Sequence, residues 1–148
     1  SYGELESKLN AVSARRDTAH AEIKRIESRS AELALVMKYA GTYRQLKPLY
    51  DRYRKSNDKE KFLRGHESEI ILFEAAAREL KRLGAVPLPT TESMKTELAN
   101  LNAEKERLLA EYKAARTEAQ EYDTVKQNVD ALLTVPKEQE QQRRHELE

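Results

Sequence analysis

The sequence predicts an all-α protein, in which a small helical knob is inserted between the two long helices of an antiparallel two-helix coiled coil. Three observations lead to this fold class. Glycine and proline number only four each among 148 residues, and 36% of the residues are charged, which is typical of long helices. Two long apolar stripes have the heptad spacing. Between them lies a segment rich in aromatic residues, and we treat residues 1–136 as one domain.

The first long helix is predicted over residues 2–40. Its stripe repeats with alternating steps of four and three residues, which is the pattern of a coiled-coil seam. The positions are Leu5, Leu9, Val12, Arg16, Ala19, Ile23, Ile26, Ser30, Leu33 and Met37. Since a lone helix of this kind would leave the stripe in water, the helix needs a partner.

The second long helix is predicted over residues 90–135, with Thr90 or Thr91 as its cap and Pro136 as its end. Its stripe has the same spacing and then shifts by one residue. The positions are Met94, Leu98, Leu101, Lys105, Leu108, Tyr112, Ala115, Ala119 and Tyr122, followed after the shift by Val125, Val129 and Leu132. The simplest closure pairs the two stripes within one chain, antiparallel.

The knob is predicted over residues 42–89. Gly41 is expected to break the first long helix, and a capping box at Thr42 opens a short helix that ends near Lys55. A further helix begins at a capping box on Asn57 and is closed by Gly84.

The stretch 70–77 in the knob is apolar nearly all round, so more than one of its sides must be covered. Either the knob buries it or one face binds a partner, and the candidate partner-binding residues are Ile70, Ile71 and Phe73.

Residues 137–148 are polar and lack a stripe, so we expect a disordered tail there. The chain opens on a serine, and Leu147 and Glu148 are typical of a vector-derived end. The expectation is an excised piece of a longer protein.

The sequence offers no catalytic constellation. Cysteine is absent, which excludes thiolate metal sites and a cysteine nucleophile and fits a reducing, cytoplasmic compartment. The three histidines, His20, His66 and His145, are too far apart to share a helical metal-binding face. We therefore expect no catalytic residue, no metal and no cofactor. No apolar run approaches the ~20 residues that span a bilayer, so no membrane partner is expected.

Positive charge is concentrated in the knob. The window 44–64 holds eight basic and three acidic residues, a net charge of +5, whereas residues 84–148 hold nine basic and 13 acidic residues, a net charge of −4. The basic residues are Arg44, Lys47, Arg52, Arg54, Lys55, Lys59, Lys61 and Arg64. Interleaved with tyrosines, they could bind phosphates and stack on unpaired bases. The alternative is an ordinary solvated helix face.

From Tyr39 to Leu133 the sequence resembles the C-terminal region of relaxase/mobilisation proteins of Gram-positive integrative and conjugative elements. The residues that carry the resemblance are Thr42-Tyr43-Arg44, Tyr50, Tyr53-Arg54, the run FLRGHESEIILFEAAARELKRL from Phe62 to Leu83, Leu88-Pro89-Thr90, Glu104-Lys105, Glu111-Tyr112, Ala115-Arg116 and Val129. In this family an N-terminal domain nicks DNA through a tyrosine and a histidine-bound metal. Only the accessory region matches, so no nicking residue is carried over.

The resemblance implies a non-catalytic accessory domain of a conjugative mobilisation relaxase. Its expected partners are single-stranded or origin DNA and the relaxosome or coupling proteins, and its expected state is a monomer or a weak homodimer. The alternative is a protein–protein scaffold or spacer coiled coil with no nucleic-acid contact.

Overall fold

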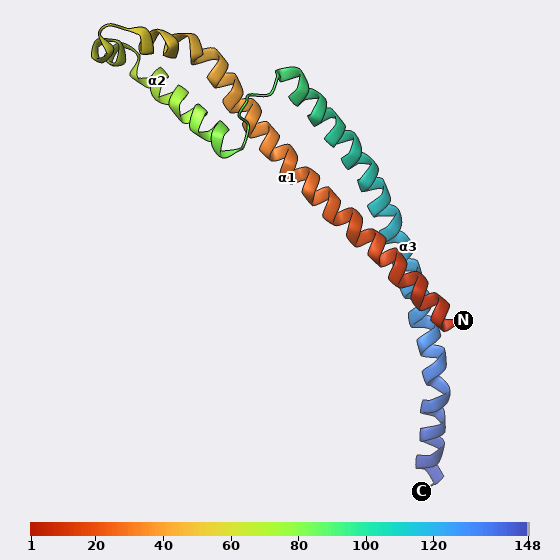
Figure 1. Cartoon of the computed structure of the whole chain (residues 1–148). Helices are drawn as coiled ribbons and strands as arrows, with labels where there is room; N and C mark the ends of the chain where they lie inside the picture. Colours follow the sequence, from red (N-terminus) through yellow and green to blue (C-terminus); the bar gives the residue numbers. More distant parts are fainter. Residues whose placement is uncertain (148) are drawn as a thin grey trace. The chain divides into compact units, whose positions relative to one another are not determined.

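The computed structural model describes the backbone of residues 1–147 and the side chains of residues 1–134. It contains α1 (Tyr2–Lys55), α2 (Lys59–Arg82) and α3 (Thr91–Leu147), and the described residues hold no strand (Figure 1). The prediction of an all-α fold is confirmed. The chain forms two compact units: unit 1 combines Ser1–Lys24 with Glu104–Glu148, and unit 2 is Arg25–Ala103.

Unit 1 is built on contacts between the first turns of α1 and the second half of α3. Val12 is buried with Ala115 and Ala119, and Leu9 and Tyr122 pack against this cluster. Alanine on α3 lets the two backbones approach closely at this level. Since lower-numbered residues of α1 meet higher-numbered residues of α3, the helices run antiparallel, as the matched stripes predict.

The last part of the predicted α3 stripe is covered only in part: Val129 is half-buried. Leu132 is 72% exposed and Val125 is also exposed. The carboxylate of Asp130, mainly through hydrogen bonding, raises the pKa of Tyr2. Because α1 begins at Tyr2, the described residues of α1 end opposite this level of α3, and Leu132 lies beyond them. Contact between α1 and α3 therefore extends to about Asp130, and Leu132 lies outside it.

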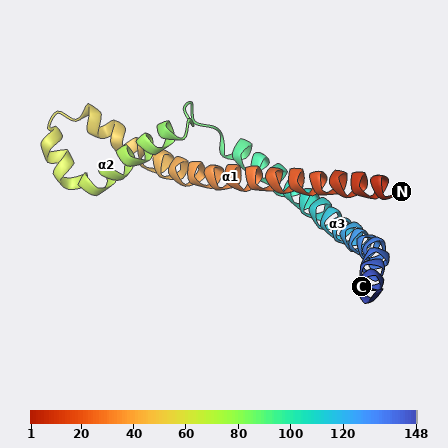
Figure 2. The ribbon, with the colours of Figure 1, turned by 90° about the horizontal axis from the view of Figure 1, so that it is seen from below.

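Unit 2 is built around the stretch of α1 that begins at Arg25. Ile26, Leu33 and Ala40 of α1 are almost completely buried. The first part of α3 lies along one side of this stretch of α1, and α2 turns back to lie along the C-terminal part of α1 (Figures 1 and 2). The buried residues from the covering helices are Ile70, Phe73, Ala76 and Leu80 of α2 and Met94 and Leu101 of α3.

The predicted break at Gly41 is wrong, because α1 continues without interruption to Lys55 and contains both Gly41 and Pro48. A glycine inside a helix costs only about 1 kcal/mol relative to alanine. Burial of Ala40 just before Gly41 and stacking of the Tyr43 ring on Phe73 just after it offset that cost. The hydroxyl of Thr42 does not open a new helix; it donates back to the carbonyl of Lys38.

The ends of α2 agree with the prediction to within one residue. The side chain of Asp58, rather than that of Asn57, caps the helix by accepting a hydrogen bond from the N–H of Lys61. At the other end Gly84 has a φ of +70°, and the N–H of Ala85 donates to the carbonyl of Leu80. This is a Schellman motif, in which the left-handed residue favours glycine.

Helix α3 starts as predicted and ends later than predicted. The Thr90 hydroxyl accepts a hydrogen bond from the N–H of Ser93 and caps the first turn. The predicted end at Pro136 is wrong for the backbone, which continues as a helix to Leu147. A proline inside a helix removes one N–H donor and its ring crowds the carbonyl four residues earlier, which disfavours a helix there without forbidding it. The tail predicted over 137–148 falls where side chains are not described, and its last residue lies outside the described backbone.

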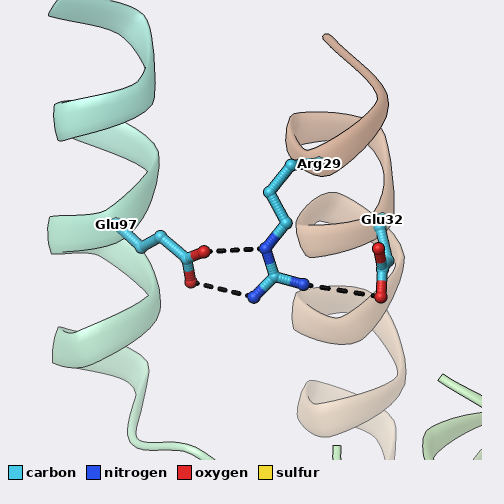
Figure 3. A network of polar contacts seen from close by, with 3 residues as sticks. All are labelled: Arg29, Glu32 and Glu97. Carbon is cyan, nitrogen blue, oxygen red and sulfur yellow. Dashed lines mark hydrogen bonds and ion pairs between the residues drawn. The ribbon is translucent and has the colours of Figure 1, made fainter. Parts of the chain in front are cut away.

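One ion-pair network fastens α3 to α1 in unit 2. Arg29 donates to both carboxylate oxygens of Glu97, at 2.7 and 3.1 Å, and its third nitrogen lies 3.4 Å from Glu32 (Figure 3). The hydrogen bond from Arg29 lowers the pKa of Glu97, and the same contact raises the pKa of Arg29. This fork geometry fixes which turn of α3 lies against which turn of α1.

Two leucines of α1 test the burial of its stripe. Leu33 is 1% exposed and Leu35 is 39% exposed. Leu33→Ala is expected to lower the free energy of unfolding by about 2–5 kcal/mol, because it leaves a cavity in the core. Leu35→Ala serves as the control and should change it by less than about 1 kcal/mol. Urea unfolding followed by circular dichroism measures both, and equal effects would contradict the assigned packing.

The Arg29–Glu97 pair predicts a pH dependence of stability. Because the folded state holds the pKa of Glu97 below its ordinary value of 4.5, the pair stabilises the fold above that pH and stops doing so as the pH falls through the lowered pKa. Both side chains are about 40% exposed, so solvent screening limits the contribution to less than about 1 kcal/mol. Glu97→Gln should therefore lower the melting temperature at pH 7, and this effect should shrink as the pH falls below 4.5. Glu106→Gln is the control. If the difference in melting temperature between Glu97→Gln and the unmodified chain were the same at neutral and at acidic pH, the linkage would be refuted.

Candidate nucleic-acid interface

The eight predicted basic residues lie on the last turns of α1 and the first turns of α2. All eight are exposed, and all belong to unit 2. The turn formed by residues 56–58 reverses the chain between the two helices, so sequence neighbours are also spatial neighbours here (Figure 2). The Ser56 hydroxyl accepts from the N–H of Asp58 and donates to its carbonyl, which holds this turn closed. The fold thus gathers the positive charge around the chain reversal between α1 and α2. We call this region, residues 44–64, the basic turn.

Most of these cations have no protein partner. Lys47 forms an ion pair with Asp51 at 3.2 Å, one helical turn along α1. Arg44 is engaged differently: its guanidinium donates to the hydroxyl of Thr91 at 2.9 Å and to the carbonyl of Pro89. The remaining six have no ion pair or side-chain hydrogen bond within the described residues. Arg44 is therefore a structural residue, whereas the six others are open to an anion.

A stack of aromatic rings lies between α1 and α2. The rings of Tyr43 and Tyr50 both stack on Phe73, with centroids 4.8 and 4.3 Å away. Further along, Tyr53 lies beside Phe62, at 6.0 Å between centroids. These contacts attach the two helices to each other.

A groove of about 430 Å³ runs past this stack. Its walls are Tyr43, Lys47, Tyr50, Asp51 and Arg54 of α1 and Phe73, Glu74, Ala77 and Arg78 of α2. A second hollow of about 600 Å³ shares Tyr43 and Ala77 with it and continues toward the end of α2.

Arg78 is a groove residue that sequence reasoning did not select. It lies outside the basic window 44–64, and only the packing of α2 on α1 makes it line the same groove as Arg54. A helical-wheel comparison of α2 would have placed Arg78 one turn from Glu74 on the same face.

The predicted partner-binding residues divide into two groups. Ile70 is 2% exposed and Phe73 is also buried, so both pack inside unit 2 and are corrected to core residues. Ile71 is 54% exposed, and its neighbour Leu72 is similarly open. The apolar run therefore serves mainly the chain's own core, and it leaves these two side chains on the surface.

The histidines lie in separate environments. The ring of His20 lies 5.7 Å from that of Tyr112 in unit 1, and His66 packs on Phe62 in unit 2, 4.7 Å between ring centroids. Nδ1 of His66 lies 3.7 Å from a Glu69 oxygen, at a point where the backbone of α2 departs from helical geometry. Among the described residues, no group of three metal-binding side chains gathers. Nor does any helix of the described part have the length and apolarity to cross a membrane.

Comparison with protein-family models, with curated proteins and with solved structures finds no match to this chain. The resemblance to relaxase C-terminal regions therefore stays a prediction.

The different engagement of Arg44 can be measured. Arg44→Ala removes the bonds to Thr91 and Pro89 that attach α1 to the start of α3, so it should lower the free energy of unfolding by about 1 kcal/mol. Arg52→Ala, on the same helix and without such bonds, is the matched control and should leave it nearly unchanged. Urea unfolding checks both. A loss of equal size in the two variants would mean that the Arg44 bonds contribute nothing.

Proposed function

We propose that this chain is a non-catalytic binding module, and that its basic turn contacts the phosphates of nucleic acid. The observation that supports this most strongly is the set of six unpaired cations at the junction of α1 and α2. An unpaired cation on a protein surface is available to a phosphate without first breaking an ion pair. The proposed contact residues are these six, Arg52, Arg54, Lys55, Lys59, Lys61 and Arg64, together with Lys47, whose ion pair with Asp51 is half exposed to solvent.

The parent protein that fits this role best is a conjugative mobilisation relaxase, of which this chain would be an accessory region. The support is the resemblance over residues 39–133 together with the basic turn that lies within them. In that setting the chain works in the cytoplasm as a monomer or weak homodimer. It holds DNA or relaxosome proteins while a separate domain carries out nicking.

A scaffold role is the second candidate. It is favoured by three apolar side chains of unit 2 that are exposed to solvent. These are Ile71 and Leu72 on α2 and Val86 in the connector. A protein partner would bury such residues. This role needs no nucleic acid, and charge reversal at the basic turn would then leave partner capture intact.

Nucleic-acid binding is tested by salt and by charge reversal. The full chain should bind a labelled oligonucleotide with an affinity that falls steeply as salt rises, because each phosphate contact releases counterions. A variant with Arg52→Glu, Lys55→Glu and Lys59→Glu should bind weakly and should lose about two units of the slope of log K against log salt. Fluorescence anisotropy at increasing NaCl concentrations measures both.

The control has the same net charge. Lys95→Glu, Lys113→Glu and Arg116→Glu change three exposed cations of α3 that lie outside the basic turn. This variant should bind like the unmodified chain. An equal loss in the two variants would mean that binding follows net charge alone, and no binding at low salt would exclude the nucleic-acid role.

A further inference from the structure

We infer that the groove between α1 and α2 seats unpaired bases, so that this chain binds single-stranded nucleic acid more tightly than duplex. This inference rests on the proposed nucleic-acid function and narrows it. It assigns a role to Tyr43, Tyr50 and Arg78, and it separates a phosphate-binding turn from a base-binding groove.

The aromatic stack supplies the surface for the bases. Phe73 is buried and lies between the rings of Tyr43 and Tyr50, which are half-buried and line the groove. Rings locked in this way lose little freedom when a ligand arrives. Contact between a base and an aromatic side chain is a main source of affinity for single strands, and it does not depend on sequence. Paired bases inside a duplex cannot reach such rings.

The rim of the groove supplies charge on both sides. Arg54 of α1 and Arg78 of α2 line it from opposite helices, and neither has an ion pair within the described residues. Of the two acids at the rim, Asp51 is already paired with Lys47, which leaves Glu74. Phosphates on either side of a seated base would therefore meet an arginine.

The second hollow gives the strand a path. It shares the wall formed by Tyr43 and Ala77 and continues past Leu80 and Lys81 toward Val86. Two hollows with one common wall suit consecutive bases of one strand. An acidic peptide would also be attracted to the cations, but its carboxylates gain nothing from the aromatic rings.

Ala77 allows the groove to be tested without a change of charge, because it lines both hollows. In the full chain, Ala77→Met should fill the groove and weaken binding of a labelled 12-nucleotide oligothymidylate about five- to tenfold, the cost of losing one stacked base. Binding of a labelled duplex of equal length through the basic turn should change less than twofold. Ala114→Met, at an exposed position of α3, is the control for size.

A second variant protects the test against misfolding. Arg78→Gln is an exposed change that should also weaken the single strand selectively, and Arg116→Gln is its control. Circular dichroism melting verifies the fold of each variant. If duplex and single strand bind equally and neither groove variant matters, the inference is wrong while the basic turn stands. If neither nucleic acid binds, the proposed function fails with it. Binding of an oligoglutamate that Ala77→Met weakens, without oligothymidylate binding, would assign the groove to an acidic peptide.

Discussion

The apolar stripe of α1 is the constraint on which the rest of the structure depends. A helix of 54 residues satisfies its own backbone but leaves that stripe in water unless other helices cover it. In unit 1 the second half of α3 covers it, and in unit 2 both α2 and the first part of α3 do so. The turn at 56–58 and the connector at 83–90 are the chain reversals that make this coverage possible within one chain.

The exposed polar groups follow from the same constraint. Once α2 has turned back to cover α1, the charged residues that flank the turn have no core to approach and point into solvent. Arg29 and Glu97 sit at the edge of the covered stripe, where a bidentate pair is partly shielded from water and can fix the level of one helix against the other. Apolar packing thus determines which helices pack together, and the ion pair determines their axial level relative to each other.

Much of this fold could be predicted from periodicity, because burial follows helical spacing. Ile23, Ile26 and Leu33 were placed in the seam by spacing alone and are buried. The continuity of α1 could not be predicted in this way. Local rules treat Gly41 as a break, and the ring contact that helps to offset its cost comes from α2, which is remote in sequence. Short-range signals therefore set the periodic stripes and the caps of α2, whereas long-range packing decides that α1 continues past Gly41.

The candidate site also has features that could be predicted from the sequence and features that depend on the packing of the helices. Exposure of the basic window follows from the cost of burying charge, so residues such as Lys55 and Lys61 could be placed on the surface from sequence. The bonds of Arg44 to Pro89 and Thr91 depend on how the connector crosses α1. Likewise Arg78 becomes part of a groove only because α2 packs on α1. The exposure of single residues could thus be predicted from the sequence, whereas contacts between residues on different helices could not.

The left-handed turn at the end of α2 makes the glycines of this chain unequal under mutational drift. Gly84 has open space around its Cα, and yet its φ of +70° is a conformation that residues with a side chain rarely adopt. Gly41 also has open space, but it lies in ordinary helix, where alanine is the better helix former. Descendants of this sequence would thus be free to replace Gly41, while position 84 would admit little besides glycine or asparagine.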